Sequence, residues 1–339
     1  MEQKNILLLC GGGHSEHDIS LISASYLKDQ LSAAQGLNVF FVEITKDGKW
    51  REEKKGNCEL NLKGELCFSS SQKEHLHYAI PCLHGPPGES GDIQSYFELV
   101  GLPYLGAGPE SSMACFNKVT TKLWFESAKI PNTPFIYLHQ FNGEALKKAY
   151  ETFENWGQVY IKSSSQGSSI GCYFIKEKEE LKEKLEMAFK FSPYVLLEKP
   201  IKGRELEMAA YEWKGNLILT DPAEIITPST AFYSFEEKYG QESQTETHVK
   251  AKNLSKDLID QMKEIAERAF KLLKIKDLSR IDFFLSEDNQ LYINEINTFP
   301  GMTPISLFPK MMEENGHHFK MFLEEKIKES TRKRNSHES

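Results

Sequence analysis

Acidic and amide side chains recur along one short segment near the end of the sequence. Asp282 follows Arg280 by two residues, and Asn297 follows Glu295 with the same spacing. The apolar residues between the pairs predict a β-hairpin in which Arg280 faces Glu295. Asp282 would then face Ile293. Because successive side chains of a strand point to opposite faces, the four polar side chains would share one face of the hairpin.

Carboxylates on a shared sheet face repel one another unless a cation lies among them. Three hard oxygen donors that act together with substrate phosphates are the usual ligands of Mg²⁺. We therefore predict that Asp282, Glu295 and Asn297 bind magnesium; the alternative is an exposed sheet face neutralised by Arg280. A glycine-bearing loop follows, in which Gly301 could present its backbone N–H to an oxyanion beside the metal.

A serine- and glycine-rich loop, 163–171, directly follows Lys162. Small residues allow backbone N–H groups to surround phosphate oxygens, and a lysine adds positive charge. The loop is not a Walker A motif, because GxxxxGK followed by Ser or Thr is absent. A plain hairpin loop is the alternative. Glu198 ends a predicted strand at which a linker between domains could bind an adenine amino group, although an isolated glutamate there is more often solvated.

The N-terminal third of the sequence has the pattern that positions such loops. Apolar runs predict strands over 5–10, 38–44 and 79–83, with a helix over 19–31. The first and third strands run into glycine-rich loops, and ligands bind at such carboxyl ends in open α/β sheets. His14, His17 and His84 lie in these loops, but their spacing resembles no zinc site, so polar contacts with a substrate are the preferred interpretation.

The rest of the chain divides into two further units. From about 109 to 198 the pattern is helix, strand, loop, strand, helix, strand, which predicts a compact second unit. After it come strands, a long amphipathic helix over 255–273 and the hairpin. A polar segment, 228–254, is too long for a routine connection, so we expect a functional loop or disorder there. The charged end, 328–339, is expected to fray.

Composition excludes several classes of protein. The 339 residues predict two or three domains. With 41 basic and 49 acidic side chains the net charge is −8, so neither nucleic acid nor a membrane surface is an expected partner. The six cysteines are irregularly spaced, and no run has the pattern of a signal peptide or a membrane span. We expect reduced thiols in a cytoplasmic protein.

Together these segments resemble the D-alanine–D-alanine ligase family of the ATP-grasp superfamily. The resemblance covers roughly residues 5–320 in the family's order, and its last motif is highly specific. The matching segments are Gly11–Gly12 with Glu16–Ser20, His84–Gly91, Tyr104–Gly106, Lys118–Lys122, Gly167–Gly171, Gly203–Glu205, Glu237–Tyr239, Arg280–Asp282, and Asn294–Thr303 with Ser306 and Leu307.

The resemblance implies an α/β chain with α+β character in its central and C-terminal parts. An N-terminal open parallel-sheet domain would precede an ATP-grasp fold, which holds ATP between two β-sheets. The implied units are a substrate-binding domain (1–107), a central subdomain (108–198), a C-terminal subdomain (199–325) with an omega loop at about 228–254, and a flexible tail (326–339). Family analogy also implies a homodimer formed through the N-terminal domain.

The resemblance assigns ATP and two Mg²⁺ (or Mn²⁺) ions as cofactors. Lys118 and Lys162 would hold the α- and β-phosphates, and Lys238 would reach the γ-phosphate. Glu198 and Glu205 would bind adenine and ribose. The two metal ions would be bound by Asp282, Glu295 and Asn297.

The implied reaction joins two D-alanine molecules for peptidoglycan synthesis. The first carboxylate attacks the γ-phosphorus to give an acyl phosphate, and the amine of the second D-alanine then attacks that carbonyl. Glu16 would face the first ammonium, with His84 near the first carboxylate. Tyr239 would hydrogen-bond to Ser168 and Glu16 when the omega loop closes. The oxyanion would be stabilised by Arg280 and the N–H of Gly301, and the second carboxylate would be held by Ser306 and Leu307.

Several positions depart from the family pattern, and they cluster around the first amino-acid pocket and the omega loop. They include His14, Ser90, Ser234 and Phe235. Two alternatives therefore stand beside the leading interpretation. One is a diverged ATP-grasp ligase for another amino-acid pair; the other is a nucleotide-binding regulatory protein that has lost ligation. A Rossmann dehydrogenase is disfavoured, because GxGxxG is absent from residues 11–18.

Overall fold

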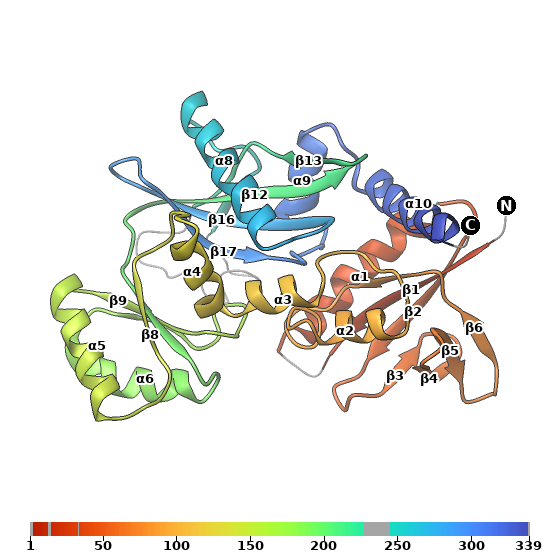
Figure 1. Ribbon diagram of the computed structural model, residues 1–339, viewed down its shortest axis with the longest axis horizontal. Helices are drawn as coiled ribbons and strands as arrows, with labels where there is room; N and C mark the ends of the chain where they lie inside the picture. Colours follow the sequence, from red (N-terminus) through yellow and green to blue (C-terminus); the bar gives the residue numbers. More distant parts are fainter. Residues whose placement is uncertain (1–2, 13–14, 33, 227–244, 338–339) are drawn as a thin grey trace.

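In the computed structural model, residues 3–12, 15–32, 34–226 and 245–337 are described, and three β-sheets form the framework (Figure 1). The first sheet has the order β6-β5-β4-β3-β2-β1-β7. Its elements are β1 (Lys4–Gly11), α1 (His17–Ser32), β2 (Leu37–Ile44), β3 (Trp50–Glu52), β4 (Gly56–Leu60), β5 (Glu65–Phe68), β6 (Lys73–His75), β7 (Tyr78–Pro81) and α2 (Asp92–Leu99).

This first sheet is mixed rather than parallel throughout. Strand β1 pairs in parallel with β2 and β7, as predicted, whereas β3 to β6 continue the sheet in antiparallel order. Strand β1 is buried on both faces: Ile6 and Leu8 pack into a core with α1, and Leu7 and Leu9 pack into a core with α2. A central parallel strand requires such a continuous apolar run.

The second sheet is antiparallel, with the order β10-β9-β11-β8. Its strands and the neighbouring helices are α3 (Pro109–Phe116), α4 (Lys118–Ser127), β8 (Phe135–Leu138), α5 (Gly143–Trp156), β9 (Val159–Ser163), β10 (Cys172–Ile175), a 3₁₀ turn at Lys178–Glu180, α6 (Leu181–Phe189) and β11 (Val195–Glu198). Asn117 caps α4 by accepting hydrogen bonds from the backbone N–H groups of Val119 and Thr120. This cap begins the helix at Lys118 and so directs that lysine towards the second sheet's loop.

The third sheet has the order β15-β14-β12-β16-β17, with β13 paired to β12. Its elements are β12 (Gly203–Trp213), β13 (Asn216–Leu219), β14 (Ala223–Ile226), β15 (Glu246–His248), α8 (Lys256–Leu272), β16 (Leu278–Ser286), β17 (Leu291–Asn297), α9 (Leu307–Glu314) and α10 (Phe319–His337). The sheets span 4–81, 135–198 and 203–297, inside the three expected units, whose boundaries stay a prediction. No helix in the described part of the chain is both long and apolar enough to span a membrane.

The predicted register of the β16–β17 hairpin is wrong by two residues. Arg280 pairs with Asn297 and Asp282 with Glu295, and a β-bulge follows Asp282, beyond which Phe283 pairs with Ile293. A bulge inserts one residue into one strand, a change that apolar alternation alone does not reveal. Because the shift is even, the four polar side chains still share one face of the hairpin, as predicted.

Residues 326–337 continue helix α10, an element that the sequence analysis did not predict; the flexibility expected for 326–339 stays a prediction. Helix α10 lies beside α1 (Figure 1), where Phe319 stacks on Tyr26. Lys326 is buried, and its ammonium lies 3.1 Å from Asp277 Oδ1 and 3.1 Å from Glu329 Oε2. The other carboxylate oxygen of Asp277 accepts the N–H of Gly106 at 2.9 Å. Lys326 therefore links α10 to the start of β16 and to the chain that leaves the first sheet.

We predict that Lys326→Met lowers the free energy of unfolding by roughly 2–4 kcal/mol, because the Asp277 carboxylate would remain buried without its cation. Urea unfolding followed by circular dichroism measures the change. Lys320→Met on the same helix is the control: its ammonium lies 3.9 Å from Glu324 in a largely solvated pair, so the loss should stay below about 0.5 kcal/mol. Equal effects of the two substitutions would contradict the assignment.

Candidate active site

Two adjoining pockets open between the three sheets, and they share a wall. The wall consists of Lys118, Gln166, Gly167, Ser168 and Glu295. The smaller pocket lies between the second and third sheets, and its lining also includes Thr133, Tyr160, Lys162, Cys172, Glu198, Glu205 and Asn294. The larger pocket lies between the loops of the first sheet and the end of β17, and its lining also includes Glu16, His84, Glu89, Glu207, Arg280, Asn297, Gly301, Ser306, Leu307 and Lys310.

Glu198 is the most strongly paired carboxylate of the smaller pocket. It is only 2% exposed, and its oxygens lie 2.6 Å from the Lys162 ammonium and 3.0 Å from that of Lys122. Burial alone would raise the pKa of Glu198, but the two ammonium groups outweigh burial and hold the pKa at about 2. Glu198 is therefore ionised and is not the solvated strand end that was the alternative.

Lys122 lines neither pocket but pairs with Glu198, a role that the sequence analysis did not predict for it. It is 1% exposed, and it also donates hydrogen bonds to the hydroxyl and the carbonyl of Thr133. Burial lowers the pKa of Lys122, and the neighbouring Glu198 opposes that effect. The available signal was its position on α4, one helical turn after Lys118, which places both lysines on the same side of the helix.

Lys118 connects the two pockets. Its ammonium donates to the carbonyl of Gln166 at 2.8 Å and lies 3.3 Å from Glu295 Oε2. Lys162 donates to Asn294 Oδ1 at 3.1 Å, in addition to its ion pair with Glu198. Lys118 on α4 and Lys162 on β9 thus both reach β17 of the third sheet; both line the smaller pocket, and Lys118 also lines the larger one.

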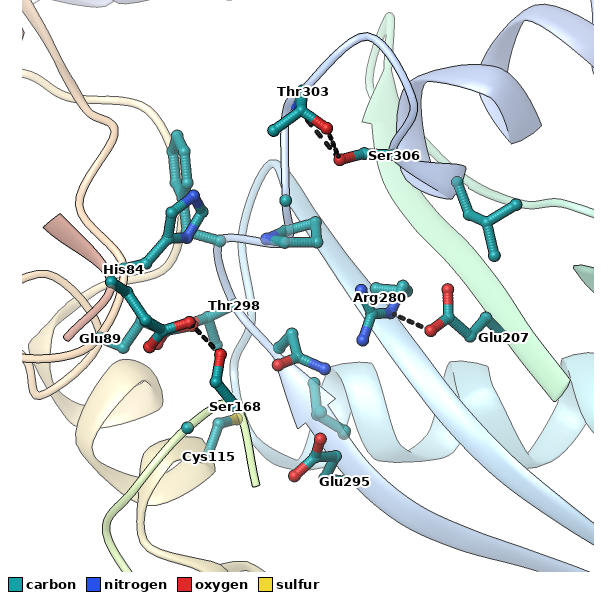
Figure 2. A pocket seen from close by; sticks show the side chains of 18 of the residues that line it. His84, Glu89, Cys115, Ser168, Glu207, Arg280, Glu295, Thr298, Thr303 and Ser306 are labelled. Carbon is teal, nitrogen blue, oxygen red and sulfur yellow. Dashed lines mark hydrogen bonds and ion pairs between the residues drawn. The ribbon is translucent and has the colours of Figure 1, made fainter. Parts of the chain in front are cut away.

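The polar face of the β16–β17 hairpin is a network of charges (Figure 2). The guanidinium of Arg280 donates two hydrogen bonds of 2.7 Å to the Asp282 carboxylate and lies 3.2 Å from Glu207 on β12. Asn297 donates its amide to Asp282 at 3.0 Å. Burial alone would lower the pKa of Arg280, but Asp282 and Glu207 raise it well above its ordinary value. Glu207 was not predicted; its place two residues after Glu205 on a strand was the only signal.

The donor set of this face suits a hard divalent cation. Asp282 and Glu295 supply carboxylates from directly opposed positions, and Asn297 supplies an amide oxygen, because its N–H₂ is turned towards Asp282. In the described residues, this face included, no group of three or more His, Cys, Asp and Glu side chains is placed to hold a metal; the set here has two carboxylates and one amide. Arg280 and Lys118 balance the two carboxylates in this structure. Asp282 is buried behind Arg280 and does not line either pocket.

Glu16 meets the second sheet's loop across the larger pocket. It is 8% exposed and accepts a hydrogen bond from the hydroxyl of Ser168 (Figure 2). A Cβ on Gly167 would lie 2.9 Å from Glu16 Oε2, so a larger residue there would displace the Glu16 carboxylate from its present position. This hydrogen bond, between residues 152 positions apart, joins the loop after β1 to the loop 163–171, which the sequence predicted to bind phosphate.

The orientation of Glu16 depends on anchors at the carboxyl end of β1. The His17 ring lies between the Gly12 carbonyl, 2.6 Å from Nδ1, and Glu43, 3.3 Å from Nε2. Ser20 accepts the N–H of Gly11 at 2.7 Å and donates to the Cys82 carbonyl at 2.6 Å. These bonds tie the start of α1 to β2 and β7, so His17 has a structural role rather than the substrate contact expected for it.

His84 and Glu89 come from the second glycine loop. The His84 ring lies 3.0 Å from the Ser23 hydroxyl, and burial lowers its pKa. Burial and the nearby Glu16 carboxylate raise the pKa of Glu89 to about 8, although the carboxylate accepts the N–H of Gly85 at 2.8 Å. The sequence analysis included Glu89 only within the segment His84–Gly91, because a raised pKa depends on burial that the sequence does not show.

The far wall of the larger pocket is the loop from β17 to α9. Ser306 accepts the N–H of Thr303 at 3.0 Å and lies 2.8 Å from its hydroxyl (Figure 2). Leu307 begins α9 directly after Ser306, and a Cβ on Gly301 would lie 3.0 Å from the Ser306 hydroxyl. Of the predicted site residues that the structure describes, all except Asp282 line one or both pockets. Lys238 and Tyr239, with His14, Ser234 and Phe235, lie outside the described residues.

Comparisons with known proteins agree with this arrangement. Residues 5–107 match the family model "D-ala D-ala ligase N-terminus", and residues 124–328 match "D-ala D-ala ligase C-terminus". The chain is 50% identical to a D-alanine–D-alanine ligase of Vibrio parahaemolyticus, over 96% of this chain and 98% of that one. It is 51% identical to one of Shewanella pealeana, over 95% and 97%.

A solved structure of D-alanyl-alanine synthetase A from Vibrio cholerae matches with a TM-score of 0.92 and 45% identity, and it covers 97% of this chain and 99% of that one. The match confirms the expected fold class, an α/β chain with the ATP-grasp pair of sheets.

We predict that Glu89→Gln flattens the dependence of stability on pH. A carboxyl group with a pKa near 8 when folded, against an ordinary value of 4.5, binds more protons in the folded chain, so stability falls as pH rises between these values. The substitution removes that contribution. Urea midpoints at about pH 5.5 and 8.5 should therefore differ less than in the unsubstituted chain. Glu59→Gln, at an exposed position, should keep the original difference between the two urea midpoints. The same difference in all three proteins would contradict the raised pKa of Glu89.

Proposed function

The chain belongs to the D-alanine–D-alanine ligase family, and on that premise we propose that it joins two D-alanine molecules at the expense of ATP for peptidoglycan synthesis. The observation that most favours this function is the shared wall of the two pockets. A nucleotide in the smaller pocket and amino acids in the larger one would meet at Lys118 and Glu295. A regulatory nucleotide-binding protein would not need the second pocket.

We assign the smaller pocket to ATP. Lys118 and Lys162 hold the α- and β-phosphates, and Glu198 and Glu205 bind adenine and ribose. Negative phosphates suit this place, because Lys118 and Lys162 both line it and Lys118 also lies on the wall shared with the larger pocket. Lys162 then exchanges part of its contact with Glu198 for a phosphate, while Lys122 continues to balance the Glu198 carboxylate.

Two divalent ions, Mg²⁺ or Mn²⁺, would be held by Asp282, Glu295 and Asn297. Bound there, they supply positive charge that offsets the charge of the phosphates during transfer. The protein's own contribution is to hold these oxygen donors on one face of the hairpin. Arg280 keeps Asp282 in place through its paired hydrogen bonds.

The first D-alanine lies in the larger pocket with its ammonium facing Glu16 and its carboxylate near His84. That carboxylate attacks the γ-phosphorus, ADP leaves, and an acyl phosphate forms. Ser168 holds Glu16 in place through its hydrogen bond. The low pKa of His84 keeps its ring neutral, so it interacts with the substrate as a hydrogen-bonding group rather than as a fixed charge.

The second D-alanine attacks the acyl carbonyl with its amine. The amine loses a proton, the C–N bond forms, and inorganic phosphate leaves. Arg280 and the backbone N–H of Gly301 stabilise the oxyanion, and Ser306 and Leu307 hold the second carboxylate. Glu207 is a positioning residue for Arg280, because it contacts the guanidinium from β12.

Tyr239 would bond to Ser168 and Glu16, and Lys238 would reach the γ-phosphate; both residues lie outside the described residues and their roles stay predictions. The homodimer and the cytoplasmic location also stay predictions. All six cysteines are free thiols, which suits a reducing compartment.

We expect the purified chain, given ATP, MgCl₂ and D-alanine, to release ADP and phosphate in equal amounts with D-alanyl-D-alanine. Mass spectrometry identifies the product, and L-alanine serves as the control substrate. Preference for another amino-acid pair would indicate the diverged ligase. ATP binding without turnover, across D- and L-amino acids, would indicate the regulatory protein.

Glu295→Gln should reduce ATP-dependent phosphate release by roughly 100-fold or more, since charge stabilisation by a coordinated metal ion is worth several kcal/mol. Unfolding should remain cooperative, which separates a lost ligand from a lost fold. Glu287→Gln, in the exposed turn of the same hairpin, is the matched control and should keep full activity. Turnover by Glu295→Gln equal to that of the control would remove the metal-binding role.

A further inference from the structure

The larger pocket contains one cation whose charge is not yet balanced. Its three basic side chains are Lys118, Arg280 and Lys310. Lys118 is paired with Glu295, and Arg280 with Asp282 and Glu207. Within the part of the chain that the structure describes, Lys310 has neither an ion pair nor a hydrogen bond. A half-buried ammonium without a counter-ion is suited to receive one from a ligand.

The position of Lys310 on α9 directs it to one end of this pocket. Lys310 follows Ser306 by four residues, so it lies one turn along the same side of the helix. Helical side chains lean towards the N-terminus of their helix, and Lys310 therefore extends back over the Ser306–Leu307 end. The Ser306 hydroxyl is bonded to Thr303 and does not cap α9.

The charges elsewhere in the pocket indicate which substrate group Lys310 would meet. Glu16 is bonded to Ser168, which lies on the other side of the pocket from Ser306 (Figure 2), and its carboxylate attracts an ammonium rather than a carboxylate. Arg280 also lines this pocket, and the reacting carbonyl is proposed to lie beside it. The Lys310 end is thus the place for the carboxylate of the acceptor, with the acceptor's amine directed towards Arg280.

We propose that Lys310 is a substrate-binding residue that pairs with the carboxylate of the acceptor amino acid and so makes a free carboxylate a requirement for the acceptor. This inference rests on the proposed ligase function. It adds a charged group to the neutral hydroxyl and N–H of Ser306 and Leu307. A carboxylate that leaves water for this pocket loses its hydration, and a cation at the same place offsets that cost.

Kinetics of three variants test the proposal. Dipeptide formation is measured against D-alanine concentration at saturating ATP, which separates the KM values of the two amino-acid sites. Lys310→Met should raise the acceptor KM by roughly 10- to 100-fold, the loss expected for a hydrogen bond to a charged group. Lys310→Arg keeps the charge, and its acceptor KM should stay within about 3-fold of that of the unsubstituted chain. Lys271→Met, on the exposed side of α8, makes the same change of net charge outside both pockets and should have no effect.

A second acceptor substrate distinguishes the loss of a contact with the carboxylate from a change in the pocket that weakens binding of any acceptor. D-alaninamide lacks the acceptor's negative charge, so the unsubstituted chain should have a far lower kcat/KM for it than for D-alanine as acceptor. The ratio of these two kcat/KM values should be smaller in Lys310→Met. The KM for ATP and the melting temperature should be unchanged in every variant. An unchanged acceptor KM in Lys310→Met would overturn the proposal, and so would a raised KM for ATP or an unchanged ratio of D-alanine to D-alaninamide. Absence of dipeptide from the unsubstituted chain would instead overturn the proposed function, and this inference with it.

Discussion

The pairing of the Glu198, Glu295 and Asp282 carboxylates with basic side chains is the constraint on which this site depends. Burying an unpaired charge costs several kcal/mol, so each of these carboxylates has to lie against a base. Glu198 on β11 meets Lys122 from α4 and Lys162 from β9. Glu295 on β17 meets Lys118 from α4. The Lys118–Glu295 pair and the hydrogen bond from Lys162 to Asn294 on β17 are the contacts that reach the third sheet across the smaller pocket.

The same balance explains how the site can accept highly charged reactants. In this structure lysines and Arg280 neutralise the carboxylates that are proposed to hold metal ions. Phosphates and divalent ions together bring both signs of charge, so they can take over these contacts without leaving a buried charge unpaired. Arg280 shows the principle most clearly, because Asp282 fixes the direction of its guanidinium and Glu207 contacts it from a neighbouring strand.

The amino-acid side of the site depends on the ends of β1 and β7. Ser20 and His17 bind the chain at the end of β1, and Ser168 then bonds to Glu16 from the second sheet. At the opposite end, α10 packs on α1 and Lys326 joins it to Asp277 at the start of β16. The larger pocket is thus bounded by parts of all three sheets, and its geometry depends on contacts between residues far apart in sequence.

Local patterns in the sequence were sufficient for the strands that carry the site and for the face on which their polar residues lie. The buried run of β1 and the alternation from Arg280 to Asn297 are local properties. The predicted pairing of the hairpin was wrong by two residues, and a shift by two keeps each side chain on the same face, so the shared polar face was still predicted correctly. The register itself depended on a bulge after Asp282. The antiparallel strands β3 to β6 and the helical C-terminus were also not predicted, because short half-exposed strands and a charged helix bury few residues with a clear period. Only the tertiary structure decided that Lys122 balances Glu198, that Glu207 contacts Arg280 and that Lys310 has no partner among the described residues. An ion pair is determined by which elements pack together and not by spacing along the chain.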